Sequence, residues 1–217
     1  MDLENRSSGA PTPIDAKRVA RTLFDYVEML ALAVAAVLIL FTFLFRLSVV
    51  SGNSMYGTLH DDDKLIISNL LYTPKTGDIV VFENDGYTQT GEPLIKRVIA
   101  TEGQFVRLGA DGSVYVYEDE NDTVGKKLNE PYASLAVLSR DGTYLGEQSG
   151  YYNTLDYLVI YEKYREKTEV PEGKIFVLGD HRNSSYDSRY FGMIDERLVL
   201  GRVLFRVSPF NQFGAVN

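Results

Sequence analysis

The stretch that decides the fold is MLALAVAAVLILFTFLF, residues 29–45, in which Thr42 is the only polar side chain. At about 1.5 Å per residue, such a run forms roughly 25 Å of helix, and the flanking apolar residues extend it to the thickness of a hydrocarbon core. The run is apolar all round and lacks the polar stripe of a helix that lies on a soluble core. We therefore predict a transmembrane anchor helix over residues 26–47.

Two other interpretations of this stretch are a buried core helix and a cleaved secretion signal. A secretion signal has an apolar part of about 7–15 residues followed by a cleavage site with small residues. The tripeptide VVS at 49–51 matches such a site poorly, and cleavage there would detach everything downstream. An uncleaved anchor therefore accounts for the stretch better than either alternative.

Basic residues lie directly before the apolar run, namely Lys17, Arg18 and Arg21. Positive charge next to a membrane span is typical of its cytoplasmic side. We therefore expect residues 1–25 to form a short cytoplasmic tail and residues 48–217 to form an extracytoplasmic domain. This predicts a single-pass protein of the cell (plasma) membrane, in direct contact with the lipid bilayer.

The composition of the 217-residue chain excludes several kinds of site. It has no cysteine, so disulfides and thiolate metal sites are not available, and its two histidines make a histidine-rich metal site improbable. The net charge of −8 argues against nucleic acid as a partner, because nucleic acid requires a basic face. We expect no metal, no cofactor and no nucleic acid.

The sequence after residue 50 consists of short β-branched and aromatic runs between Gly, Pro, Asn and Asp turns. This pattern predicts a mainly β domain. The runs are KLIIS at 64–68, DIVVFE at 78–83, LIKRVIA at 94–100, SVYVYE at 113–118, KIFVLG at 174–179 and GRVLFRV at 201–207. Residues 119–170 are more polar and less regular, which suits an inserted cap subdomain.

Two residues in this domain are candidates for a catalytic pair. Ser54 lies in SGNSMYGTL, only eight residues after Arg46, so its hydroxyl must work close to the membrane surface. Lys96 lies in PLIKRVIA, where alternation along a strand forces at least one of Lys96 and Arg97 onto an apolar face. Burial lowers the pKa of a lysine and produces a neutral amine that can accept a hydroxyl proton. Taken alone, Ser54 is better explained as an ordinary turn serine, and Lys96 is equally consistent with a strand charge that reaches solvent.

A third segment, GDHRNSSYDSRYFG at 179–192, is dense in small polar and charged residues. Its paired charges could form ion pairs that hold a loop in place, and Ser184 and Ser185 could exchange hydrogen bonds there. By itself it is also consistent with a solvated turn after the strand at 174–179.

Together these segments resemble the type I signal peptidase family, serine proteases with a Ser–Lys dyad. The family's boxes occur in order behind one anchor, and the resemblance runs to about Pro209. The matching segments are SGNSM at 51–55 with Thr58 and Leu59, GDIVVF at 77–82, IKRVIATEG at 95–103 and GDHRNSSYDSRYFG at 179–192. The resemblance implies a mainly β catalytic domain of the signal-peptidase type with an inserted cap, preceded by one N-terminal transmembrane helix.

The resemblance also assigns roles to residues. Ser54 takes the position of the nucleophile, Lys96 that of the general base, and Ser185 that of the serine that orients the lysine amine. The backbone of Ser54 and the region of Gly52 take the position of the oxyanion site. The family's structural charged positions are filled by Asp180, Asp187 and Arg189.

The substrates that the resemblance implies are secreted preproteins, cut after Ala-X-Ala-like sites, with the secretion translocase nearby. The cleavage region would bind as an added strand beside residues 48–53 and 93–96, with small pockets for its side chains. The pocket positions are Val50, Met55, Leu59, Leu94 and Ile95.

The chain departs from the family pattern at two places near the site. Gly57 replaces a usual proline, which predicts a looser turn after the nucleophile, and His181 replaces a usual asparagine. Three other functions stay open. One is a Ser–His–Asp protease that uses His181 and Asp180, since geometry and not chain order decides a triad. The others are a self-cleaving repressor, which would need a DNA-binding head, and a membrane-tethered binding protein that has lost catalysis.

Overall fold

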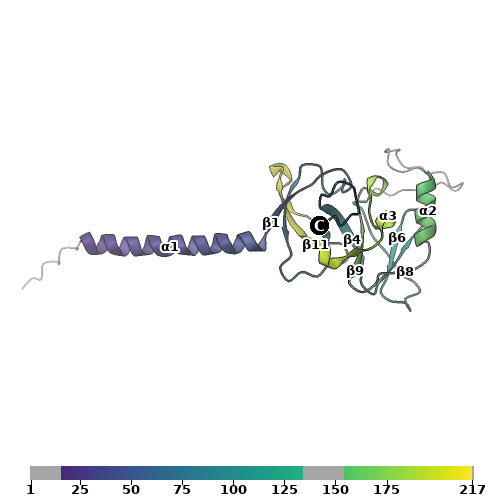
Figure 1. The fold of residues 1–217 in the computed structure, drawn as a ribbon, viewed down its shortest axis with the longest axis horizontal. Coiled ribbons are helices and arrows are strands. Elements are labelled where there is room, and N and C mark those ends of the chain that lie inside the picture. Colours follow the sequence, from purple (N-terminus) through teal and green to yellow (C-terminus); the bar gives the residue numbers. More distant parts are fainter. Residues whose placement is uncertain (1–15, 134–153, 217) are drawn as a thin grey trace, which may run out of the picture. The chain divides into compact units, whose positions relative to one another are not determined.

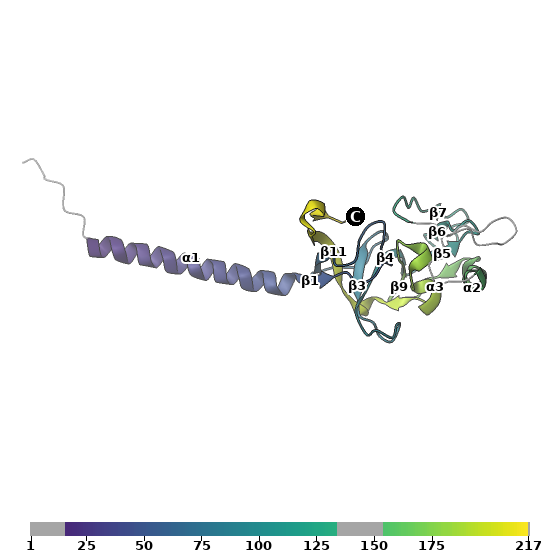
Figure 2. The same ribbon diagram turned by 90° about the horizontal axis from the view of Figure 1, so that it is seen from above.

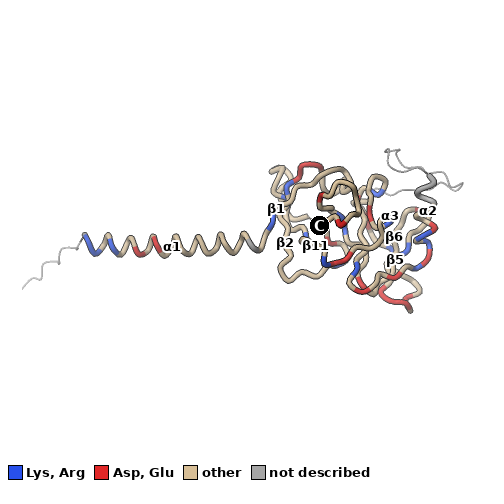
Figure 3. Tube along the Cα trace, in the orientation of Figure 1, with Lys and Arg blue, Asp and Glu red and all other residues tan. Residues whose placement is uncertain are grey.

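The computed structural model describes residues 16–133 and 154–216, and the fold divides into an N-terminal unit and a body that begins at Leu44. The N-terminal unit consists of the helix α1, Ala16–Leu44. Within the described residues it is the one helix long and apolar enough to cross a membrane, over Lys17–Thr42. Its charged residues occupy its first half, and the remainder is uncharged (Figure 3). The predicted anchor is therefore a continuous helix.

The body, Leu44–Asn217, is mainly β, as the sequence predicts (Figure 1). Its strands are β1 Arg46–Val49, β2 Lys64–Ser68, β3 Ile79–Phe82, β4 Leu94–Thr101, β5 Phe105–Leu108, β6 Val114–Tyr117, β7 Lys126–Lys127, β8 Thr168–Glu169, β9 Lys174–Leu178, β10 Ile194–Asp195, β11 Val199–Ser208 and β12 Gly214–Ala215. The helices are α2 Thr154–Tyr164 and α3 Ser188–Phe191, with short 3₁₀ turns η1 Arg182–Ser184, η2 Glu196–Leu198 and η3 Phe210–Gln212.

The main sheet has the strand order β1-β2-β11-β3-β4-β9-β10, with β12 paired to β11, and all its pairs are antiparallel. The sheet curls, so β3 is buried on both faces. Ile79 and Val81 pack into one apolar cluster, while Val80 and Phe82 pack into another. This accounts for the unbroken apolar run at 79–82, which would alternate with polar residues if one face met water.

A second sheet, of order β7-β6-β5-β8, lies with α2 at the end of the body away from β1 (Figures 1 and 2). It is inserted between β4 and β9 in the chain, and a third apolar cluster packs it and α2 against the main sheet. The insertion starts with β5 at Phe105, earlier than the predicted residue 119. The difference arises because β5 and β6 are ordinary strands in sequence, and only their pairing assigns them to the second sheet.

The predicted strand runs all appear as β2, β3, β4, β6, β9 and β11. The helix α1 begins ten residues before the predicted anchor span of residues 26–47 and ends three residues before its C-terminal bound. The helix ends at Leu44, and Arg46 and Leu47 instead pair with Ile67 and Ile66 of β2. Pairing with β2 satisfies the backbone amide groups of Arg46 and Leu47. The helix therefore does not continue to Leu47, although that residue is apolar.

Candidate active site

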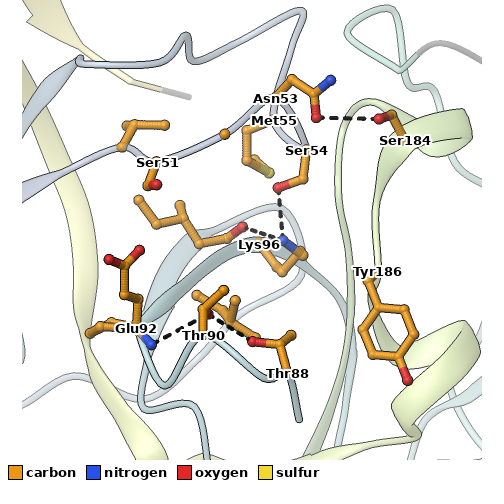
Figure 4. A pocket seen from close by; sticks show the side chains of 15 residues that line it. Ser51, Asn53, Ser54, Met55, Thr88, Thr90, Glu92, Lys96, Ser184 and Tyr186 are labelled. Atoms are coloured by element: carbon orange, nitrogen blue, oxygen red, sulfur yellow. Dashed lines mark hydrogen bonds between the residues drawn. The ribbon is translucent and has the colours of Figure 1, made fainter. Parts of the chain in front are cut away.

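A groove of about 310 Å³ opens in the body beside the start of β4 (Figure 4). One wall is the segment Val50–Met55, which follows β1, and the facing wall is the segment that leads into β4. The remaining lining comes from the loop after β9. The lining residues are Val50, Ser51, Gly52, Asn53, Ser54, Met55, Thr88, Thr90, Glu92, Pro93, Leu94, Ile95, Lys96, Ser184 and Tyr186. The three segments singled out in the sequence therefore meet at one site.

The nucleophile segment is held as a closed loop between β1 and β2. The Val50 amide donates to the Asp63 carbonyl (2.9 Å), and the Asp62 amide donates to the Val50 carbonyl (3.0 Å). Inside the loop the Gly52 amide donates to Asp61 Oδ1 (2.7 Å), with Gly52 at φ +88°. Because glycine adopts this left-handed conformation without a steric penalty, the chain can turn here and present Ser54 to the groove.

The serine and the lysine form a direct pair in the groove, with Ser51 and Glu92 on one side of it and Tyr186 on the other (Figure 4). Lys96 Nζ donates to Ser54 Oγ at 2.8 Å and to the carbonyl oxygen of Ile95 at 3.0 Å. Lys96 is only 3% exposed, while Ser54 is half-buried at the groove surface. The amine is therefore enclosed by protein, and the hydroxyl it contacts faces the space where a substrate would lie.

Burial changes the acidity of this lysine. Desolvation, opposed by Asp187 and Asp180 and assisted by Arg189, lowers the pKa of Lys96 to about 8. At that pKa about one amine in ten is neutral at pH 7, against roughly one in 2,500 for an unperturbed lysine. A neutral amine at hydrogen-bonding distance from a hydroxyl is a general base in position to act.

The neighbouring basic residue, Arg97, is also buried, but its charge is paired. Its Nε and Nη2 atoms donate to the two carboxylate oxygens of Asp180, at 2.9 and 2.8 Å. Thr58, three residues after Met55, donates to the same carboxylate at 2.6 Å. Asp180 therefore joins β4 to the nucleophile loop, as a structural charged residue would.

The loop after β9 is held by a second ion pair. Asp187 accepts from Arg189 Nε (2.8 Å) and from the Gly179 amide (3.0 Å). Burial by itself would raise the pKa of Asp187, but the charge and hydrogen bonds of Arg189 outweigh it and hold that pKa below its usual range. Arg189 also donates to the carbonyl oxygen of Arg182 (2.7 Å), which fixes the loop between them.

Ser185 is fully buried beside the dyad, at the point where the backbone of Gly179 approaches Ser54. A Cβ at Gly179 would collide with the Ser185 side chain and with the Ser54 carbonyl oxygen, so only glycine fits there. Among the described residues Ser185 Oγ has no hydrogen-bond partner. The second contact of the Lys96 amine is the Ile95 carbonyl, and the expected bond from Ser185 to the amine is not formed in this structure.

The two backbone amides expected to bind an oxyanion, those of Gly52 and Ser54, differ in their hydrogen bonding. The Gly52 amide is engaged by Asp61, whereas the Ser54 amide makes no hydrogen bond to any described residue. Of the two expected donors, the Ser54 amide is therefore the one that stays available to accept an oxyanion as its partner.

His181 lies beside the segment that contains Ser54, but its imidazole does not contact Ser54 Oγ. Its backbone amide donates to the Ser54 carbonyl (3.0 Å), and its Nδ1 lies 3.2 Å from the Asn53 carbonyl. Asp180, the other member of the rival triad, is occupied by Arg97 and Thr58. The geometry disfavours a Ser–His–Asp triad, because the imidazole contacts backbone carbonyl oxygen instead of Ser54 Oγ.

Four of the five expected pocket residues line the groove, namely Val50, Met55, Leu94 and Ile95. Leu59 does not. It is 0% exposed and packs in the apolar cluster that supports the nucleophile loop. The turn that follows Ser54 directs Leu59 inward, since the Leu59 amide bonds back to the Met55 carbonyl (2.9 Å).

The segment just before the undescribed residues carries site contacts that sequence reasoning missed. Glu130 forms a buried ion pair with Arg182 of the loop after β9, and the centre of the Tyr132 ring lies 3.9 Å from the Arg97 guanidinium carbon. The Tyr132 carbonyl oxygen packs directly on Gly57, which has φ +107°. The turn at Gly57 is thus closely packed against Tyr132.

One strand edge at the groove is open. The pairing of β4 with β9 begins at Arg97, so Leu94–Lys96 are paired on the β3 side only. The nucleophile wall continues β1, which is itself an edge strand of the sheet. An extended peptide could therefore add a strand between the two walls.

Comparison with known proteins identifies the relatives of this chain. Residues 23–208 match the family described as signal peptidase, peptidase S26. The chain is 34% identical to a signal peptidase I of Bacillus licheniformis over 88% of this chain and 91% of the relative. It is 31% identical to a signal peptidase IB of Staphylococcus aureus over 89% and 93% of the two chains. A solved signal peptidase I from Enterococcus faecalis is 29% identical with a TM-score of 0.38, covering 60% of this chain and 97% of that one.

Proposed function

Because the chain belongs to the signal peptidase family, peptidase S26, we propose that it removes signal peptides from secreted preproteins. As a member of that family it is a serine endopeptidase, a hydrolase. The finer proposal is that it cuts after Ala-X-Ala-like sites, with Ser54 as nucleophile and Lys96 as general base.

The observation that carries this proposal is the 2.8 Å contact between the buried Lys96 amine and Ser54 Oγ in the lining of an open groove. A lysine without a carboxylate partner is costly to bury in its charged form, so its environment favours the neutral amine. That cost is understandable if the amine serves as a base. Neither a histidine nor a metal ion is needed in this mechanism.

In the first half of the reaction, Ser54 Oγ attacks the carbonyl carbon of the residue before the cut while Lys96 Nζ takes the hydroxyl proton. The carbonyl oxygen becomes an oxyanion, to which the Ser54 amide can donate. When the intermediate collapses, the carbon–nitrogen bond breaks and the leaving amine receives the proton from the Lys96 ammonium. The signal peptide is then held as an ester on Ser54.

In the second half, Lys96 takes a proton from a water molecule, which attacks the ester carbonyl. The carbon–oxygen bond to Ser54 breaks, and the proton returns from Lys96 to Ser54 Oγ. Ser185 is proposed as a positioning residue for the amine, since its hydroxyl is buried beside the dyad and unpaired among the described residues.

Substrate binding is proposed as strand addition along the open edge at Leu94–Lys96. The apolar walls at Val50, Met55, Leu94 and Ile95 would receive the small side chains one and three residues before the cut. Alternate side chains of an extended peptide point to the same face, which accounts for the X between two alanines.

Membrane anchoring by α1 is proposed with the N-terminus in the cytoplasm and the body outside. Lys17, Arg18 and Arg21 at the start of α1 support that orientation. Phe210 and Phe213, which are 88% and 62% exposed, support additional contact of the body with the lipid interface. The secretion translocase would then deliver the substrate at the same membrane.

The test is cleavage of an internally quenched peptide with an Ala-X-Ala site by the full chain in detergent. We expect Ser54→Ala and Lys96→Ala each to lower kcat/KM by at least about 10⁴-fold, because the two groups act as one unit. The matched control is Lys126→Ala, an exposed lysine in β7, which should retain activity. The acidic limb of the pH profile should have its midpoint near pH 8, where the Lys96 amine loses its proton.

Retention of most activity by Lys96→Ala would contradict the proposed base. A wild-type protein that binds a full-length preprotein but never cuts it would instead support the tethered binding protein.

A further inference from the structure

One side chain of the groove has no role in the proposed reaction. Glu92 and Lys96 are the charged residues in the groove lining, and whereas Lys96 is buried, Glu92 is exposed. The Glu92 carboxylate points from the β4 wall toward Ser51 on the opposite wall (Figure 4). In the part of the chain that the structure describes, no lysine or arginine forms an ion pair with it.

The loop that presents Glu92 is held by its own hydrogen bonds. The Thr88 amide donates to Asn84 Oδ1 (2.8 Å), and the hydroxyls of Thr88 and Thr90 are 3.0 Å apart. The Glu92 amide in turn donates to Thr90 Oγ1 (3.4 Å). These bonds hold the backbone of Glu92 in place in the groove wall. The polar atoms next to it in that wall are the threonine hydroxyl oxygens.

The position of Glu92 along the groove can be related to the dyad. Glu92 precedes Lys96 by four residues, which span about 13 Å of extended chain. In the chain, Leu94 and Ile95 lie between Glu92 and Lys96 of the dyad, and Val50 lies on the opposite wall. If those walls receive the residues one and three before the cut, Glu92 faces the residue about four before it.

We propose that Glu92 is a specificity-determining residue that binds a lysine or arginine side chain about four residues before the cut. This inference rests on the proposed function. A carboxylate on the wall of a groove that a peptide closes off from water forms a stronger bond to a cation than it does on an open surface. An acidic side chain at the same position of the substrate would be repelled. The enzyme would therefore favour preproteins with a basic residue at this place.

The experiment compares quenched Ala-X-Ala peptides that differ at a single position. Lysine, glutamine or glutamate is placed in turn at each position from about three to about six residues before the cut. The full chain in detergent is assayed as wild type, Glu92→Gln, Glu92→Lys and Glu83→Gln. Glu83 is an exposed acid at the start of the same loop and does not line the groove, so it is the matched control.

At one of these substrate positions, wild type and Glu83→Gln should prefer lysine to glutamate by about tenfold in kcat/KM. This preference should fall as the salt concentration rises from about 50 to 500 mM. Glu92→Gln should reduce this ratio to within about twofold, and Glu92→Lys should reverse it. The proposal is overturned if wild type cuts the glutamine peptides but shows no lysine preference at any position. It is also overturned if Glu92→Gln keeps the wild-type ratio. Failure to cut any peptide would overturn the proposed function itself, and this subsite with it.

Discussion

Strand β4 carries two adjacent basic residues, Lys96 and Arg97, that are almost equally buried, at 3% and 2% exposure. Arg97 is paired with Asp180, bonded to the Gly77 carbonyl (2.8 Å) and covered by the Tyr132 ring. Lys96 has a hydroxyl and a carbonyl as partners, and no carboxylate forms an ion pair with it among the described residues. Burial alone therefore does not distinguish the ion-paired Arg97 from Lys96, the proposed base, whereas the presence of a neutralising partner does.

The comparison predicts that Lys96 and Arg97 respond differently to mutation of their surroundings. The largest change in stability is expected when Arg97 loses its partner. Asp180→Ala should lower the free energy of unfolding by about 3–5 kcal/mol, because it leaves Arg97 buried without a counter-charge. Thermal or urea unfolding in detergent measures this. The matched control is Arg197→Gln, which removes the exposed partner of Asp195 and should not shift the transition resolvably.

The double variant Arg97→Met with Asp180→Leu sharpens the same point. Replacing both charges by apolar side chains removes the unpaired charge, so much of the lost stability should return. If Asp180→Ala unfolds like the wild type, the Arg97 pair is not what holds β4 to the nucleophile loop.

A smaller effect of the opposite sign is expected at Lys96. Its folded pKa of about 8 lies below the unfolded value, so the folded state carries the full cost of the buried charge below pH 8. As pH rises from 8 toward 10.4, the folded chain has already released the proton and wild-type stability recovers. Lys96→Met, which does not titrate, should therefore gain about 3 kcal/mol over wild type at pH 7 relative to pH 10.5. If the difference in unfolding midpoint between Lys96→Met and wild type does not change with pH, the lowered pKa of Lys96 is contradicted.

The smallest effect is expected at His181. His181→Asn should change kcat/KM by less than about threefold, because the backbone amide that holds the Ser54 carbonyl is retained. Peptide cleavage at pH 7 and 9 measures it, with His60→Asn as a second histidine control. A loss of about a thousandfold would make the imidazole the base, and the isolation of Lys96 would then have no catalytic meaning.

Most of the fold was predictable from local pattern. The predicted strands appear with bounds that differ by two residues or fewer, since β-branched runs between turn residues carry a strong local signal. The second sheet was misplaced at its start, because the strand at 105–108 looks the same in sequence whichever sheet it joins. The end of the anchor was misplaced because β1 depends on β2, almost twenty residues away.

The same division holds for the site. Ser54 and Lys96 were recognisable from their segments, and the structure brings them into contact. The partners that hold them were not. Glu130 pairs with Arg182, and Tyr132 packs on Gly57 and Arg97, although nothing near Glu130 or Tyr132 in sequence indicates either contact.

The sequence by itself determined the apolar helix, the β character of the body and the residue types able to perform the chemistry, because hydrophobic periodicity and side-chain chemistry are local properties. Only the tertiary structure decided which of two adjacent cations is left without a counter-charge, because that depends on Asp180 arriving beside Arg97 from 83 residues away. It also decided that Ser185 is enclosed, that Leu59 is core and that Glu92 faces the groove. Burial and pairing are properties of neighbours in space, and the chain order does not contain them.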